Sequence, residues 1–375
     1  MTASPAQLAA VLLRFILSIT LFGMVMAWAW AFMQLRDRKP LLEPSKRIDA
    51  PWTLTTVGIV VMTWLLVQIA ISVIYMAASG QLTPVPPAEG KPKALGKMSS
   101  AELMAITSIA NLVLLILIPI ALSTATRAPL RALGLQWAGL KRNVSAGVMG
   151  FLITTPVVYF VNFTASRLWQ YLGQKSLEHP VQDMIEANFG IGSAIIALIS
   201  AVVLAPAAEE LIFRGLIQGW LANQFRPVVI SHRPSHDDLA FPQEDLILES
   251  LDSEVSFPAD SEPKDSSVLV PTTTRTLAIV ATSVLFGGVH IAQWPAPIAI
   301  FVLALGLGWI YDRTGSLIAP FVMHALFNGL ATILLFHSML QPKPAVDAHK
   351  PPGPAMQTHV HLPSIAAVHS RSSRP

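Results

Sequence analysis

Two adjacent glutamates, Glu209 and Glu210, lie in an apolar run that also holds Arg214, within Ala-Pro-Ala-Ala-Glu-Glu-Leu-Ile-Phe-Arg-Gly. A carboxylate at membrane depth costs about 2.5–3.5 kcal/mol on insertion scales, so such residues usually serve a function. Residues four apart share a helix face, so we expect Glu210 to pair with Arg214. Glu209 points about 100° away and is left free to face a cavity and take up a proton. A buried structural ion pair alone would explain Glu210 and Arg214, but not Glu209.

Two histidine motifs follow on other apolar segments, Phe286-Gly-Gly-Val-His290 and His324-Ala-Leu-Phe-Asn328. Each motif alone is typical of a polar contact between membrane helices. Together with the glutamates they supply the residue types of a water-activating site, in which a carboxylate serves as general base. The histidines would hold the water, bind a metal or donate to a developing oxyanion. The same residue types also build proton relays in membranes, so the residues by themselves leave both functions open.

The composition indicates which class of protein carries these residues. The chain has 375 residues, of which 53% are hydrophobic and 13% charged, with a mean hydropathy of +0.56. Soluble domains carry about 25% charged residues, so half that level predicts a polytopic membrane protein. The chain has no cysteine, which excludes disulfides, thiol nucleophiles and cysteine-bound zinc. A net charge of +3 gives no indication of a nucleic-acid partner.

The hydropathy pattern predicts an all-α fold, a membrane helical bundle with about eight transmembrane helices. A spanning helix needs about 20 mostly apolar residues. The first apolar run is too long for a signal peptide, so we expect it to remain as a helix. Cationic loops after the first and third spans predict that these loops are cytoplasmic and that the N-terminus lies outside. The expected spans are 8–35, 52–78, 102–124, 144–168, 190–222, 276–293, 296–312 and 316–337.

The chain divides into three predicted parts. Residues 1–143 would form N-terminal transmembrane helices, and residues 144–337 a membrane core that carries the polar motifs. Residues 228–274 are rich in Ser, Pro, Asp and Glu and are expected to be a disordered acidic insertion in this core. The tail 338–375 is rich in Pro, His and Ser and is expected to be disordered as well.

The three polar motifs, in this order and each in an apolar segment, resemble those of the CAAX-protease and bacteriocin-processing (CPBP, or Abi) family of intramembrane proteases. The segment Tyr311-Asp-Arg-Thr-Gly-Ser316 also resembles that family's turn between the last two core helices. The resemblance covers roughly residues 190–332. It implies an integral membrane endopeptidase, with the cell (inner) membrane of a bacterium as its expected location. Its expected partners are the lipid bilayer and a membrane-associated peptide or protein substrate. The expected activity is similar to that of a CAAX prenyl protease, but the sequence implies no prenylated substrate.

The resemblance also implies a role for each site residue. Glu209 would activate the hydrolytic water with the help of His290, and Glu210 and Arg214 would hold the site together. The last two site residues, His324 and Asn328, would stabilise the tetrahedral intermediate or complete the water site. The family is usually described as metalloproteases. Any zinc would need His290, His324 and Glu209 as a three-ligand set, which leaves one position open for water.

One feature of the sequence sets a condition on this hypothesis. Straight, strictly alternating spans would place Glu209 and His290 near opposite membrane faces, so one helix must be broken or tilted. Pro206 and Pro295 are the candidate breaks.

Two other functions stay open: a proton-coupled transporter that uses the same residues as a relay, and a proteolytically silent scaffold or immunity factor. Paired broken helices in two related halves would indicate a transporter, but no matching ionisable set precedes residue 190.

Overall fold

A computed structural model describes most of the hydrophobic part of the chain. The expected acidic insertion, up to residue 271, and the tail from residue 341 lie outside the described residues. Residues 1–334 form one compact unit, which contains every site residue discussed below; the last turns of α11 lie beyond it. The described residues are 5–45, 50–79, 100–127, 129–174, 195–196, 198–224 and 272–340.

The described residues are helical and contain no strand, which confirms the all-α prediction. The longer helices are α1 (Pro5–Arg36), α2 (Leu54–Ala78), α3 (Ser100–Thr126), α4 (Leu140–Tyr171), α9 (Thr272–Gly288), α10 (Ala296–Thr314) and α11 (Ile318–Leu340). Single 3-10 turns, η1 (Leu130–Leu133) and η5 (Ile291–Gln293), precede α4 and α10. The run from residue 198 to residue 224 changes geometry along its length, through η2 (Ser200–Leu204), α7 (Ala205–Glu210), η3 (Leu211–Gln218) and α8 (Gly219–Gln224).

Six of these helices are long and apolar enough to cross a membrane, among the residues that the structure describes. They are α1, α2, α3, α4, α10 and α11, and they agree with six of the roughly eight expected spans. The other two expected spans, 190–222 and 276–293, are helical where described but are not continuous long α-helices. Residues 200–204 and 211–218 are π-helical, and α9 has only 17 residues. The number of about eight spans is therefore approximate, because hydropathy measures apolar length and not helix geometry.

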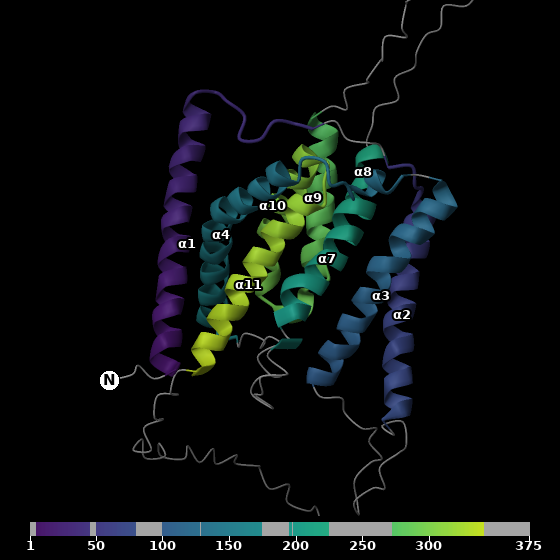
Figure 1. Cartoon of the computed structure of the whole chain (residues 1–375), viewed down its shortest axis with the longest axis horizontal. Helices are drawn as coiled ribbons and strands as arrows, with labels where there is room; N and C mark the ends of the chain where they lie inside the picture. Colours follow the sequence, from purple (N-terminus) through teal and green to yellow (C-terminus); the bar gives the residue numbers. More distant parts are fainter. Residues whose placement is uncertain are drawn as a thin grey trace, which may run out of the picture. The chain divides into compact units, whose positions relative to one another are not determined.

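Helix α10 is central to the bundle. Figure 1 shows α1 and α4 on one side of it and α9 and α7 on the other, with α2 and α3 farther along. Helix α4 approaches α10 and α11 closely through two glycines. A Cβ at Gly147 would lie 2.6 Å from the Ala319 carbonyl oxygen, and one at Gly150 would clash with Ile310 and Met323. Small residues at these positions permit tight helix packing without a hydrophobic driving force.

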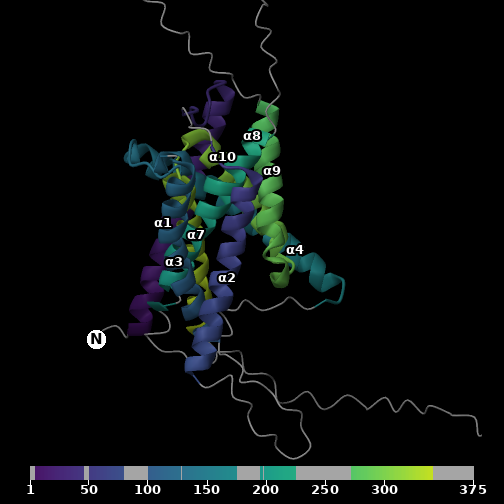
Figure 2. The same ribbon diagram turned by 90° about the vertical axis from the view of Figure 1, so that its right-hand side faces the viewer.

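The outer helices present apolar side chains to their surroundings. On α1 and α2, Phe22, Phe32 and Ile74 are 67%, 68% and 67% exposed. By contrast, Leu114, Leu216 and Tyr311 in the interior are fully buried. This inside-out distribution fits helices in contact with lipid, and the chain is an integral membrane protein. Figure 2 shows the C-terminal part of α4 extending away from the other helices.

The expected conflict between Glu209 and His290 is resolved by the length of α9. This helix ends at Gly288, and the chain turns at residues 289–295 before α10 begins. Its 17 residues span about 26 Å, so it stops short of a full crossing. Glu209 lies in the middle of the helical run 198–224, which stays helical through Pro206. Because α9 is short and the chain turns directly after it, His290 and Glu209 line the same cavity.

Candidate active site

A buried network joins Glu210 to two basic side chains. One oxygen of Glu210, Oε2, lies 3.2 Å from Nε of Arg214, as the four-residue spacing predicts. The other oxygen, Oε1, lies 2.8 Å from Nδ1 of His324 on α11. The side chains of Glu210 and Arg214 are each only 1% exposed. Both carboxylate oxygens of Glu210 are therefore occupied by protein groups, and this residue acts as a structural centre.

Arg214 and Gln218 fasten the π-helical segment η3 to α10. Arg214 donates from Nη2 to the carbonyl of Ala304 at 3.3 Å, and Gln218 donates from Nε2 to the carbonyl of Gly308 at 2.9 Å. The two donors are four residues apart on η3, and the two acceptors are four residues apart on α10. The hydrogen bonds therefore join two successive turns of one helix to two successive turns of the other. A Cβ at Gly308 would lie 3.0 Å from Oε1 of Gln218, so only glycine leaves room for this contact.

The ring of Phe286 lies at the centre of the network. Cζ of the Arg214 guanidinium is 4.6 Å from its centroid, a cation–π contact. The ring centroids of Phe213, His290 and His324 lie 4.9, 5.1 and 5.8 Å from it. One aromatic ring thus holds Arg214 and both predicted histidines in fixed relative positions.

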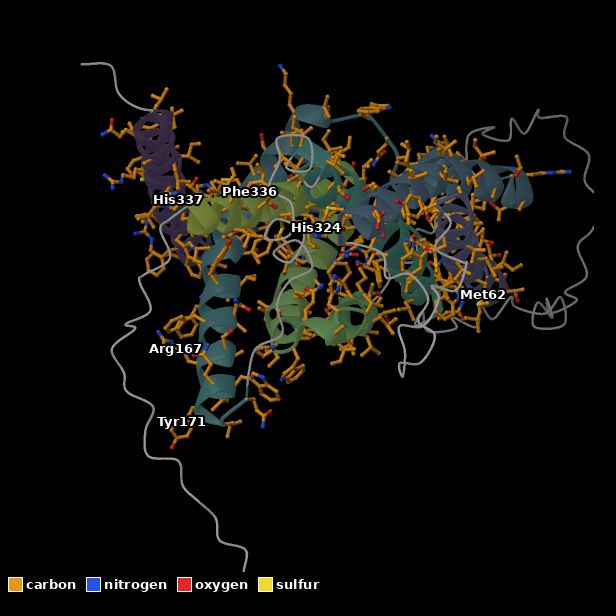
Figure 3. All side chains as sticks on the ribbon, turned by 90° about the horizontal axis from the view of Figure 1, so that it is seen from below. Met62, Arg167, Tyr171, His324, Phe336 and His337 are labelled. Atoms are coloured by element: carbon orange, nitrogen blue, oxygen red, sulfur yellow. The ribbon has the colours of Figure 1, made fainter. Side chains whose placement is uncertain are left out.

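Glu209 has a different environment from its neighbour. Its side chain is 29% exposed, and its Oε2 lies 3.7 Å from Nε2 of His324. It faces a cavity of about 540 Å³ that reaches from α3 and α4 to α10 and α11. His290, His324 and Asn328 line the same cavity. Figure 3 shows His324 in the interior, far from Arg167 and Tyr171 at the end of α4.

The hydrogen bonds of the two histidines determine which ring nitrogen is available. Nδ1 of His290 lies 2.8 Å from the carbonyl oxygen of Phe286, which can only accept, so this nitrogen carries the proton. Nδ1 of His324 is similarly the donor to the Glu210 carboxylate. In each neutral ring Nε2 is then the acceptor. Nε2 of a neutral His290 therefore accepts from a molecule in the cavity, whereas Nε2 of His324, which lies 3.7 Å from Oε2 of Glu209, donates when that ring is protonated.

Asn328 joins α11 to the π-helical segment η2. Its Nδ2 donates to the carbonyl of Ala201 at 3.0 Å. In the same segment, Oγ of Ser200 lies 2.5 Å from Oγ of Ser108 on α3. The segments η2 and η3 flank the two glutamates on either side. Such π-helical turns are often found at functional sites, because they change the direction of side chains within a helix.

The cavity side chains do not form a three-ligand metal site in this arrangement. Among the described residues no three His, Asp or Glu side chains are grouped so that they could hold one ion. Glu209 and Nε2 of His324 are neighbours, whereas the third predicted ligand, His290, does not complete the set. The zinc ligand set predicted from the resemblance therefore does not fit the geometry, and we assign no chemical step to a metal.

The structure thus places the six predicted site residues in two layers. The lining of the cavity holds Glu209, His290, His324 and Asn328, and the buried layer behind it holds Glu210 and Arg214. Sequence reasoning missed Gln218 and Phe286 as parts of the site. The spacing of Glu210, Arg214 and Gln218, four residues each, is a signal that could have found Gln218, since all three share one helix face. The cavity walls from α3 and α4, including Tyr159 and Asn162, carry no such signal.

The fold and this site together define a class: a polytopic helical membrane protein with a carboxylate and two imidazoles around an internal cavity. A family model, "Type II CAAX prenyl endopeptidase Rce1-like", matches residues 191–233 and 265–330. The match includes all three polar motifs and confirms the resemblance to the CPBP family. No curated protein and no solved structure matched the chain.

Proposed function

We propose that the protein is an intramembrane endopeptidase in which Glu209 activates a water molecule. The observation that carries this proposal is the contrast between the two glutamates. Glu210 has both oxygens engaged in the buried network, whereas Glu209 faces a cavity shared with two imidazoles. A general base must reach the proton that it takes up, and only Glu209 is open to a substrate water. The Rce1-like match supports a CAAX-type protease.

In the proposed reaction, Glu209 takes a proton from the water as its oxygen attacks the carbonyl carbon of the peptide bond. Nε2 of His290 accepts a hydrogen bond from the other O–H of this water and so orients it, and that hydrogen stays on the attacking oxygen. The tetrahedral intermediate carries a negative oxygen, which a protonated His324 stabilises by donating from Nε2. The proton on Glu209 then passes to the nitrogen of the leaving amine, and the carbon–nitrogen bond breaks. The products are a carboxylic acid and an amine.

Three residues have positioning roles in this proposal. Glu210 fixes the ring of His324 through Nδ1, and Arg214 neutralises Glu210. Asn328 holds α11 against η2, so that His324 stays beside Glu209. This assigns Asn328 a different role from the direct stabilisation of the intermediate that the resemblance implies. The donor is already engaged with the Ala201 carbonyl.

The cavity walls support a substrate segment of mainly apolar character. Leu103, Val158, Ile300, Leu303 and Phe327 line it together with the polar residues. Among the described residues that line it, none is Lys or Arg. We propose a membrane-associated peptide as substrate, in keeping with the family description. We also propose that the protein lies in the inner membrane of a bacterium. A prenylated C-terminal peptide is the first substrate to test.

The experiment is cleavage of membrane-associated reporter peptides by the purified full chain reconstituted in lipid nanodiscs. Glu209→Gln keeps the side-chain shape but removes the base, so the rate should fall by at least about 100-fold. The matched control is Glu102→Gln, which removes a carboxylate of α3 that is hydrogen-bonded to Tyr75 and does not line the cavity. Both variants should unfold at a temperature close to that of the parent protein. Full cleavage by Glu209→Gln would refute the assignment.

A further inference from the structure

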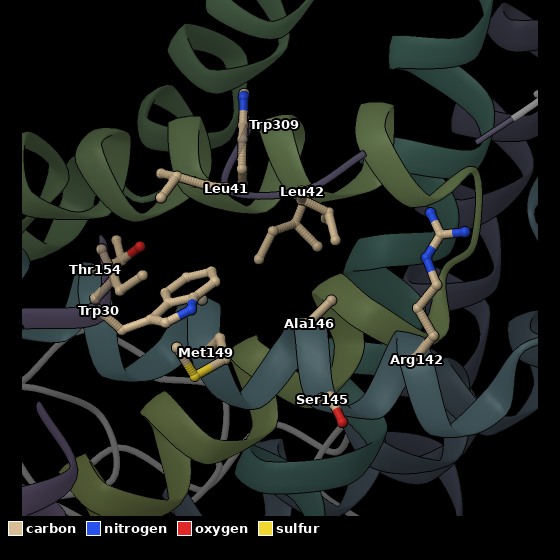
Figure 4. A pocket seen from close by; sticks show the side chains of 13 residues that line it. Trp30, Leu41, Leu42, Arg142, Ser145, Ala146, Met149, Thr154 and Trp309 are labelled. Atoms are coloured by element: carbon tan, nitrogen blue, oxygen red, sulfur yellow. The ribbon is translucent and has the colours of Figure 1, made fainter. Parts of the chain in front are cut away.

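A second cavity, of about 390 Å³, lies between α1, α4 and α10 and shares no lining residue with the active-site cavity. Most of its lining is apolar, including Trp30, Leu42, Met149 and Trp309. Figure 4 shows these side chains around the space, with Arg142 toward one end and Thr154 toward the other. Apolar cavities of this kind stay dry and bind apolar molecules. This cavity plays no part in the proposed reaction.

The length of the cavity matches one leaflet of a bilayer. Its wall along α4 runs from Arg142 to Thr154, which at about 1.5 Å per residue is about 18 Å. Half of a hydrocarbon core about 30 Å thick is about 15 Å. An extended acyl chain of one leaflet therefore fits along this wall, and Trp30 and Trp309 lie beside it.

One end of the cavity is cationic. The Arg142 side chain is exposed, and its guanidinium donates to the backbone carbonyl of Glu43 at 3.1 Å. It forms no ion pair with a carboxylate of the described residues. Arg313 lies over the ring of Trp309 at 5.9 Å, and its buried Nε has no hydrogen-bond partner. Arg38, in the connection after α1, and Lys141, in the first turn of α4, lie at the same end, which the charge bias assigns to the cytoplasmic side.

The loop after α1 closes this end as a fixed wall. Leu41 and Leu42 line the cavity from this loop. The Arg142 hydrogen bond ties the loop to α4, and the backbone N–H of Ser45 donates to the carbonyl of Arg313 at 2.8 Å, which ties it to α10. The cavity is thus a built site with an apolar channel and a basic end.

We propose that this cavity binds an anionic phospholipid of the surrounding bilayer. The phosphate and headgroup contact the Arg142 guanidinium, and one acyl chain lies along α4 as far as Thr154. Basic pockets between transmembrane helices on the cytoplasmic side suit anionic headgroups, and the cytoplasmic leaflet supplies them. The charge of Arg142 makes the site selective for an anionic lipid over a zwitterionic one with the same chains.

The test is a lipid titration of the delipidated full chain in detergent, read by native mass spectrometry. The probes are phosphatidylglycerol and phosphatidylcholine with identical acyl chains. Arg142→Gln keeps an amide donor for the Glu43 carbonyl but removes the charge, so it should weaken phosphatidylglycerol binding about fivefold. The matched control is Lys141→Gln, an exposed cation that does not line the cavity, which should change binding less than about twofold because salt screens it.

A second variant tests the apolar channel. Met149→Trp fills the cavity and should reduce the binding of both lipids while Arg142 stays in place. Equal binding of the two lipids by the parent protein would overturn the proposal, and so would equal losses in Arg142→Gln and Lys141→Gln. Displacement of phosphatidylglycerol by a prenylated peptide, one for one, would also overturn it, because the cavity would then hold a substrate chain.

Discussion

The first two helices and the C-terminal core differ in the number and the burial of their charged side chains. Helix α2 contains no Asp, Glu, Lys, Arg or His, and the single charged residue inside α1, Arg14, is exposed. Among the described residues, the buried charged and imidazole side chains all follow residue 200; they are Glu210, Arg214, Asp312 and His324. Helices α1 and α2 therefore present apolar surfaces, and the buried ionisable side chains of the described residues lie in the part of the chain that the Rce1-like family model matches.

This asymmetry also bears on the alternative functions. A transporter with inverted repeats would carry its broken helices and ionisable residues in two related halves. The π-helical segments of the described residues, η2 and η3, both flank the glutamates in one half. A silent scaffold would have no need of a carboxylate that faces a cavity between two imidazoles. The contrast between the two regions thus favours an enzyme, and the predictions below are designed to break that contrast.

The largest effect is expected for Arg214→Met in the core. The substitution leaves Glu210 buried without its cation, which costs about 3–5 kcal/mol of stability. It also removes the donor to the Ala304 carbonyl and the cation over Phe286. Denaturation of the purified protein in detergent measures the change. The control in the other region, Arg14→Met, removes an exposed charge and should stay within about 0.5 kcal/mol of the parent protein. Similar losses in both variants would contradict the contrast.

A second prediction separates chemistry from folding within the core. His290 is half-buried, and its side chain is held by a hydrogen bond from Nδ1 to the Phe286 carbonyl. We expect His290→Gln to lower the cleavage rate by about 100-fold and to leave the unfolding temperature nearly unchanged.

Gln293→Ala is the control for this second prediction, because Gln293 lines the same cavity without a proposed chemical role. It should lower the cleavage rate far less than His290→Gln. Equal losses of activity in the two variants would mean that the shape of the cavity, and not the imidazole of His290, limits the rate.

The sequence predicts local parts of this structure well. The long apolar runs predict α1 to α4, α10 and α11, because length and hydropathy are sufficient to identify a spanning helix. The pair of Glu210 and Arg214 follows from their spacing alone. The family motifs select the residues that gather around one cavity, although no single motif would have been sufficient.

The features of the structure that the sequence does not predict depend on packing between distant parts of the chain. His324 pairs with Glu210 across 114 positions, a contact set by the way α11 lies against α7. The π-helical geometry of η2 and η3 is not visible in hydropathy, since the residues are as apolar as in an α-helix. The walls from α3 and α4 were also not predicted, because their lining residues follow no motif.

The smallest effect is expected from the loss of a single hydrogen bond between helices, and each region offers one such bond for comparison. Asn328 donates to the Ala201 carbonyl in the core, and Trp28 donates from Nε1 to the Ile153 carbonyl between α1 and α4 at 3.1 Å. Each bond joins two helices, so Asn328→Ala and Trp28→Phe should each cost about 1 kcal/mol of stability.

Activity, however, should fall only in Asn328→Ala, because Asn328 holds α11 and thereby positions His324 beside Glu209. Helices α1 and α4 can lose one contact without moving either residue. A positioning role further predicts that Asn328→Ala lowers kcat more than it raises KM for the reporter peptide, since the bound substrate meets a misplaced imidazole. A fall in activity in Trp28→Phe of the same size would show that the N-terminal helices shape the site after all.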